Sequence, residues 1–157
     1  SNLSTFDVST LLNKDKNKYW REVVTMLLFD ALIGNSDRHP GNFLYSEERG
    51  FYPLFDNGSS LCAYERDCNV QAILKDKNRF NAMCITKSKP VLRAGQRITH
   101  RELVTILREN FPTEMRKFCE ALQDFNLSDM WEDIKVPDCR KLIINEFLTY
   151  RLDWFKL

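Results

Sequence analysis

A long apolar segment near the start of the chain constrains the fold more than any other feature. Residues 23–33 read VVTMLLFDALI, in which Thr25 and Asp30 are the only polar positions. A helix that is apolar nearly all round is a buried helix, so we expect a central helix from about Lys16 to Ile33. Gly34 follows it as a natural left-handed stop. Polar groups just past Gly34 should therefore lie at the end of a rigid, buried element.

Three polar residues follow at spacings that suit phosphoryl transfer. Asp37 is followed five residues later by Asn42, and fourteen residues after that by Asp56 of the segment 56–58 (DNG). In this chemistry one carboxylate orients the attacking hydroxyl and accepts its proton, while an amide oxygen and a second carboxylate hold the metal ions that bridge the phosphates. Protein kinases place an Asp and an Asn at the same five-residue offset, with the metal-binding Asp on a following Asp-x-Gly.

A predicted hairpin brings these dispersed residues together. Residues 43–45 (FLY) and 51–54 (FYPL) flank the polar turn 46–50 (SEERG) and read as two short strands. Such a hairpin would return Asp56 to the side of Asn42. Aspartate and asparagine are also common turn residues, which is the plainer interpretation. The placement after a buried helix and around a hairpin favours a site.

This part of the chain resembles the C-terminal lobe of HipA-like serine/threonine kinases. The resemblance rests on residues 32–39 (LIGNSDRH), 42–43 (NF) and 53–56 (PLFD), and covers about residues 20–60. The helical remainder fits the family only in general character. The Asp-Arg-His order of residues 37–39, reversed from that of ordinary protein kinases, also recurs in phosphatidylinositol kinases. Where HipA has an Asp followed by apolar residues, this chain has 56–58 (DNG).

The resemblance implies a mainly α fold: a protein-kinase-like C-terminal lobe, helical with a short catalytic β-hairpin. It implies ATP and Mg²⁺ as cofactors, Asp37 as the catalytic base, and Asn42 and Asp56 as the residues that bind magnesium and nucleotide. Arg38 and His39 complete the expected catalytic loop. Arg38 would pair with a carboxylate or phosphate, or lie solvated at the surface. His39 would support the loop or act more directly, and support is favoured because Asp37 already fills the base role.

The rest of the chain divides into a basic segment and a helical remainder within one domain of 157 residues. Residues 61–98 carry eight Lys and Arg against three Asp and Glu, a net charge of +5, and we expect them to be irregular. A basic loop there would hold an acidic substrate, a phosphorylated side chain or nucleic-acid backbone, or form a solvated face. In residues 99–157 we expect helices that begin at Thr99, whose spacing to Glu102 is that of a capping box, at Pro112 or Thr113, after a Ser128 cap (around Met130 to Ile134), and at Pro137 or Asp138.

The apolar positions of these helices recur at helical spacing and predict the core. We expect one face of residues 112–124 to pack inward through Met115, Phe118, Cys119 and Leu122. The last helix should pack inward through Leu142, Ile143, Phe147, Tyr150 and Trp154.

Several features needed to hold a nucleotide are absent from the sequence. There is no Gly-x-Gly-x-x-Gly and no Gly-Lys-Ser/Thr. We also find no strand-borne Lys before a helical Glu in the order that kinases use to hold the α- and β-phosphates. About twenty residues precede the central helix, too few for an ATP-clamping β lobe. We therefore expect a C-lobe that is completed by an N-terminal lobe in the same or a separate chain, and that is inactive or very weak alone.

Composition narrows the remaining classes. The net charge of +1 argues against a strongly nucleic-acid-binding domain. The longest apolar run is too short to span a membrane, and we expect no signal peptide. The five cysteines form no Cys-x-x-Cys pair, and with two histidines a zinc site is disfavoured. Reduced thiols in a cytoplasmic protein are the plain interpretation.

Two hypotheses of function remain open from the sequence. In the first, the chain is the catalytic C-lobe of a HipA-like kinase that transfers the ATP γ-phosphoryl group to a Ser/Thr hydroxyl of a protein substrate, with a lipid or small molecule as the alternative acceptor. In the second, it is a non-catalytic scaffold of a toxin–antitoxin-type complex with an antitoxin or DNA-binding partner. Retention of Asp37, Asn42 and Asp56 favours the first, because a scaffold needs none of them.

Overall fold

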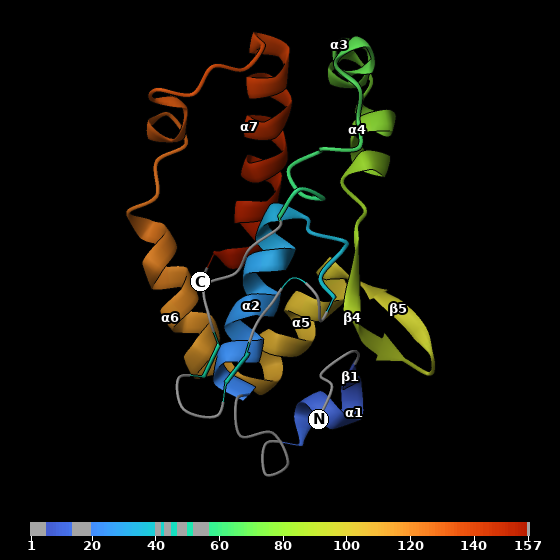
Figure 1. Ribbon diagram of the computed structural model, residues 1–157, viewed down its shortest axis with the longest axis vertical. Helices are drawn as coiled ribbons and strands as arrows, with labels where there is room; N and C mark the ends of the chain where they lie inside the picture. The colour runs from blue at the N-terminus through green and yellow to red at the C-terminus, as the bar shows by residue number, and fades with distance from the viewer. Residues whose placement is uncertain are drawn as a thin grey trace.

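One buried helix forms the centre of the chain. The computed structural model describes residues 6–13, 20–39, 42, 45–46, 50–51 and 57–156. The central helix is α2 (Trp20–Ile33). Three other helices pack against it: α5 (His100–Asn110), α6 (Pro112–Gln123) and α7 (Asp138–Leu152) (Figure 1). The expected central helix is confirmed over residues 20–33, and residues 16–19 lie outside the described part. Thr25 is exposed, whereas the buried side chains are those of Val23, Val24, Met26, Leu27, Leu28, Asp30, Ala31, Leu32 and Ile33.

The position directly after the end of α2, residue 34, requires glycine for two separate reasons. Its φ is +69°, in the left-handed region where a Cβ is unfavourable. A Cβ built on Gly34 would also lie 2.6 Å from Cζ of Phe147, which is buried on α7. The predicted stop is therefore confirmed, and α7 restricts the same position from outside.

The helices of the C-terminal part follow the sequence expectations closely. Thr99 caps α5 in a capping box with Glu102, as predicted. α6 buries Met115 and Cys119, with Phe118 and Leu122 partly buried against the core. The short helix expected around residues 130–134 is a 3-10 turn, η3 (Asp129–Trp131), and the Ser128 side chain makes no capping bond there. α7 is followed by η4 (Asp153–Phe155).

One core position on α7 was predicted wrongly. Leu142 is 56% exposed, while α7 buries Ile143, Ile144, Phe147, Leu148 and Arg151. Residues three and four apart share a helix face, and the buried face of α7 carries Ile143, Ile144 and Phe147. Leu142 therefore lies off the buried stripe.

The basic segment 61–98 is structured, and the expectation of irregularity was wrong. It forms α3 (Asp67–Lys75), α4 (Lys77–Met83), β4 (Lys87–Arg93) and part of β5 (Gln96–Thr99). α3 buries Val70 and Ile73, and the Asp76 side chain caps α4. Pro90 lies inside β4. In a sequence, a proline argues against a strand at its position. The β4–β5 register shifts between Lys87 and Leu92, and such irregularities are where a strand accepts proline.

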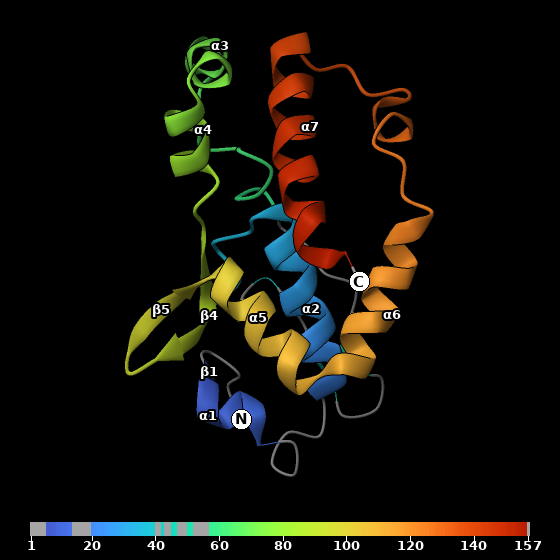
Figure 2. The same ribbon diagram turned by 180° about the vertical axis from the view of Figure 1, so that it is seen from behind.

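The strands form two small sheets. β1 (Phe6–Asp7), followed directly by α1 (Val8–Leu12), pairs in parallel with β4 through Phe6 and Val91. β4 pairs antiparallel with β5, and this three-stranded sheet lies beside α5 (Figure 2). β2 (Tyr45–Ser46) and β3 (Gly50–Phe51) pair antiparallel. This confirms the predicted antiparallel pairing, although Ser46 and Gly50, expected in the turn, belong to the strands; residues 43–44, 47–49 and 52–54 of the predicted hairpin lie outside the described residues. Among the described residues, no helix combines the length and apolarity needed to cross a membrane.

Candidate active site

The loop after α2 is fixed by the end of that helix. The Asn35 backbone N–H donates to the Asp30 carbonyl at 2.9 Å, and its side-chain amide donates to Asp30 Oδ1 at 3.2 Å. Asn35 Oδ1 in turn accepts the Asp37 backbone N–H at 3.0 Å. Asn35 is buried, so the backbone of Asp37 is tied directly to the rigid helix.

A buried ion pair lies under the loop. Arg38 is fully buried, and its Nε and Nη2 donate to the two carboxylate oxygens of Asp30 at 2.9 and 2.6 Å. Burial raises the pKa of Asp30, while the bonds from Arg38 oppose that rise. Of the two interpretations of Arg38 from the sequence, the structure shows the carboxylate partner and not the solvated side chain. The sequence had indicated Asp30 only as a polar position within an apolar helix.

The same guanidinium joins three segments of the site. Arg38 Nη1 donates to the Asn42 carbonyl at 3.1 Å, and Nη2 donates to Asn57 Oδ1 at 2.7 Å. Asn57 immediately follows Asp56 in the sequence. Asp56, the predicted second metal ligand, lies outside the described residues, but its neighbour is held against the loop that carries Asp37. The segment after Asp56 is anchored again where the Leu61 N–H donates to the Ile33 carbonyl at 2.8 Å.

Asn42 turns its side chain back onto the loop. Its Nδ2 donates to the Asp37 carbonyl at 2.9 Å, and its Oδ1 accepts the His39 backbone N–H at 3.0 Å. The residue is 2% exposed. An amide oxygen has two lone pairs, so Oδ1 retains acceptor capacity beyond its bond to His39. The five-residue spacing seen in the sequence therefore corresponds to a closed, hydrogen-bonded loop.

Asp37 differs from its neighbours because its carboxylate reaches solvent. The side chain is 42% exposed, Oδ1 accepts from Lys89 Nζ, and Oδ2 lies 4.0 Å from His39 Nε2. The bond from Lys89 holds the pKa of Asp37 below its ordinary value. Asp37 is thus an ionised, accessible acceptor on a rigid backbone. Lys89 lies on β4, and sequence spacing gave no signal for it beyond the basic character of residues 61–98.

Oxygen donors are the chemistry that magnesium prefers, and the amide of Asn42 with a carboxylate at Asp56 would supply them. Within the described residues, no group of three or more His, Cys, Asp or Glu side chains gathers as a metal site. The predicted magnesium ligands are Asn42, which is not one of these residue types, and Asp56, which lies outside the described residues. The magnesium site therefore stays a prediction. All five cysteines are free thiols.

Comparison with known proteins identifies a likeness of fold. No family model matches the chain, and no curated protein matches it significantly. Among solved structures, it is similar to the crystal structure of a Helicobacter pylori proinflammatory kinase, CtkA, with a TM-score of 0.63 and 19% identity. The match covers 93% of this chain and 55% of that one, so the chain spans about half the length of the kinase.

At that identity the likeness shows the fold alone. The predicted fold class is confirmed: the chain is mainly helical with short strands and has the architecture of a kinase C-terminal lobe. The finer assignment to HipA-like kinases remains an expectation from residues 32–56.

Proposed function

We propose that the chain is the catalytic C-terminal lobe of a serine/threonine kinase that transfers the γ-phosphoryl group of ATP to a hydroxyl of a protein. The observation that carries the proposal is the exposure of the Asp37 carboxylate on a loop that the buried side chains of Arg38 and Asn42 hold in place. Asp37 would accept a hydrogen bond from the acceptor hydroxyl and then its proton. A module that only needed the shape would not require an accessible carboxylate on a backbone held in place by buried hydrogen bonds.

The surrounding residues support this assignment by fixing position. Arg38 would not touch the reacting atoms, since it is fully buried; it fixes the loop between Asp37 and Asn42. Asn42 and Asp56 would hold magnesium, which when bound neutralises charge on the phosphates. His39 lies near the Asp37 carboxylate and donates its backbone N–H within the loop. Nucleotide clamping falls to an N-terminal lobe, and the cytoplasmic location expected from the free thiols is part of the same proposal.

Three substitutions in the full-length protein separate these roles. Asp37→Asn keeps the shape but removes the proton acceptor, so turnover should fall by about 10²–10⁴-fold with nucleotide affinity nearly unchanged. Asp56→Asn should weaken magnesium-dependent nucleotide binding and abolish turnover together. Asn42→Ala should weaken binding less, because it removes a neutral ligand, but it also frees the loop backbone.

Calorimetry with and without magnesium, beside initial rates, measures both quantities for each variant. If Asp37→Asn lost magnesium-nucleotide binding while Asp56→Asn kept it, the two roles would be reversed. If all three variants matched the wild type in an active preparation, the site would lie elsewhere in the protein.

A further inference from the structure

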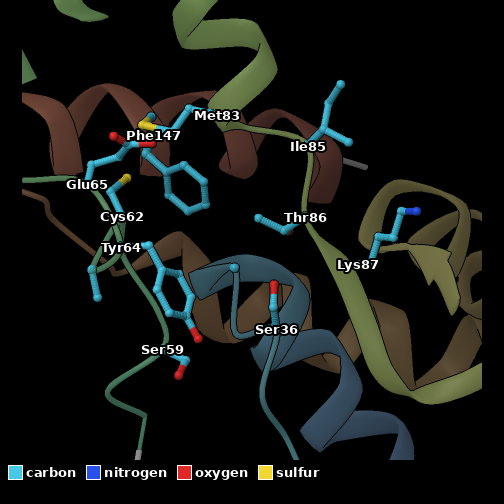
Figure 3. Close-up of a pocket in the computed structure, with 12 residues that line it drawn as sticks. Ser36, Ser59, Cys62, Tyr64, Glu65, Met83, Ile85, Thr86, Lys87 and Phe147 are labelled. Atoms are coloured by element: carbon cyan, nitrogen blue, oxygen red, sulfur yellow. The ribbon is translucent and has the colours of Figure 1, made fainter. Parts of the chain in front are cut away.

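A pocket of about 270 Å³ opens at Ser36, the residue that precedes Asp37 in the sequence (Figure 3). Three segments of the candidate site form it. Gly34 and Ser36 lie between the end of α2 and Asp37, residues 59–65 follow the segment of Asp56, and residues 83–87 lead into β4. The pocket is therefore built from the same loops as the site, yet none of its lining residues has a role in the proposed transfer of phosphate.

The walls of the pocket are apolar and unusually exposed. Tyr64 and Ile85 are 73% and 67% exposed, the two highest values among the exposed large hydrophobic residues of the described part of the chain. Both line the pocket, together with Met83 and the buried Phe147 of α7. Exposed apolar side chains that gather around one hollow and are rimmed by polar groups mark a binding site. Here the polar lining residues are Ser36, Ser59, Glu65, Thr86 and Lys87.

The size of the pocket suits a small occupant. Small-molecule and cofactor sites enclose roughly 300–1,000 Å³, so a pocket of about 270 Å³ lies at the small end of that range. It has room for a large side chain. An extended chain advances about 3.3 Å per residue, and Ser36 adjoins Asp37 in sequence. A side chain in the pocket would therefore belong to a residue close in sequence to the one at Asp37.

Charge narrows the occupant further. Lys87 lines the pocket and Lys89 contacts Asp37. Residues two apart on a strand point to the same face, so one face of β4 carries both lysines, while Glu65, across the pocket, is the one acidic residue of its lining. A segment that crosses this face meets positive charge, which favours acidic over basic residues.

We propose that this pocket binds the acceptor segment of a protein substrate through a large apolar side chain within about three residues of the accepting serine or threonine, in a segment that is acidic rather than basic. The inference rests on the proposed function, because Asp37 defines where the accepting hydroxyl lies. It adds the features that select the acceptor: Tyr64, Ile85 and Met83 for the apolar side chain, and Lys87 with Lys89 for charge.

A positional-scanning peptide library tests the proposal with the full-length protein and magnesium-ATP. Each peptide has one central serine or threonine, and each flanking position is fixed in turn to every amino acid. Phosphate incorporation should select a large apolar residue at one position within three of the acceptor, and Asp or Glu over Lys or Arg at others. Absence of any apolar selection, or a preparation that hydrolyses ATP but phosphorylates no peptide, would overturn the proposal.

A matched pair of variants assigns the selection to the pocket. Ile85→Ser removes an exposed wall of the pocket, and Ile134→Ser makes the same change at a residue that is 45% exposed and does not line it. Ile85→Ser should lower kcat/KM for the selected peptide by roughly tenfold and leave unchanged the value for a peptide with alanine at the selected position. Ile134→Ser should change neither. Equal losses in both variants, or none in Ile85→Ser, would overturn the proposal.

Two further measurements separate this inference from the proposed function. A fluorescent copy of the selected peptide, with alanine at the acceptor position, should bind Asp37→Asn and fail to bind Ile85→Ser at the same concentration, as measured by anisotropy. If Asp37→Asn lowers transfer by the expected factor while Ile85→Ser leaves peptide selection intact, the pocket proposal is wrong and the kinase assignment stands. If Asp37→Asn transfers phosphate at the wild-type rate, the kinase assignment of this site is wrong.

Discussion

Replacement of Arg38 by methionine tests how the candidate site is held together. Methionine keeps an unbranched apolar stem but removes the guanidinium that donates to Asp30 at 2.6 Å. Asp30 is 2% exposed, so its carboxylate would remain buried without its cationic partner. Breaking a buried pair by removing one partner costs about 3–5 kcal/mol. The bonds to the Asn42 carbonyl and to Asn57 Oδ1 are lost as well, so we expect the upper part of that range.

An exposed pair in the same chain provides the control. Arg93 lies 3.6 Å from Glu102, and both side chains are at least half exposed. Exposed ion pairs contribute about 0–1 kcal/mol, so Arg93→Met should hardly change stability. Urea unfolding of wild type, Arg38→Met and Arg93→Met, followed by circular dichroism, measures the free energies of unfolding. A loss in Arg38→Met no larger than that in Arg93→Met would refute the reasoning.

The pH dependence gives a second readout of the same substitution. The pKa of Asp30 is already raised by burial, and Arg38 is what opposes the rise. Without Arg38 the pKa of Asp30 should rise further, because desolvation would no longer be opposed by the bond and charge of Arg38. A carboxyl whose pKa is higher folded than unfolded gains stability as the pH falls through the folded value. Arg38→Met should therefore recover part of its loss between neutral pH and about pH 5, where the wild type recovers less.

Two other substitutions test single contacts. Lys89→Met removes the bond that lowers the pKa of Asp37, so the acidic limb of the rate profile should move to higher pH; an unmoved limb would show that Lys89 does not tune Asp37. Gly34→Ala should destabilise more than Gly95→Ala in urea unfolding. Both have positive φ, +69° and +75°, but only at Gly34 does an added Cβ meet another atom, Phe147 Cζ at 2.6 Å, while nothing lies within 4 Å at Gly95. Strain alone costs about 1–2 kcal/mol, and equal losses would show that Phe147 yields freely.

The parts of the fold that sequence reasoning could predict depend on neighbouring residues. The burial of α2 follows from the composition of 23–33, and the start of α5 follows from Thr99 and Glu102, which are three residues apart. The β2–β3 hairpin follows from its polar turn. Each signal lies within a few residues of the structure that it specifies, so one sequence is enough to find it.

What escaped prediction depends on residues that meet only after folding. β1 pairs with β4 across more than eighty residues of sequence, Phe6 with Val91. Lys89 contacts Asp37 across 52 residues. No periodicity marks such pairs. Asp30 and Arg38 are only eight residues apart, yet the end of α2 lies between them. The sequence therefore showed Asp30 as a charge that interrupts an apolar helix, but it did not show that Arg38 is its partner.

The site combines two neighbouring residues with opposite environments. Arg38 is fully buried and donates to three different segments, while the adjacent Asp37 is exposed to solvent and to Lys89. A group that must meet a substrate cannot itself be locked by packing, because packing would cover it. The burial of Arg38, the next residue along the backbone, avoids this conflict. Because the peptide unit between the two residues is rigid, a fixed Arg38 also fixes the backbone position of Asp37. If Asp37 is the base, the buried pair beneath it determines the precision of that base without contacting the acceptor.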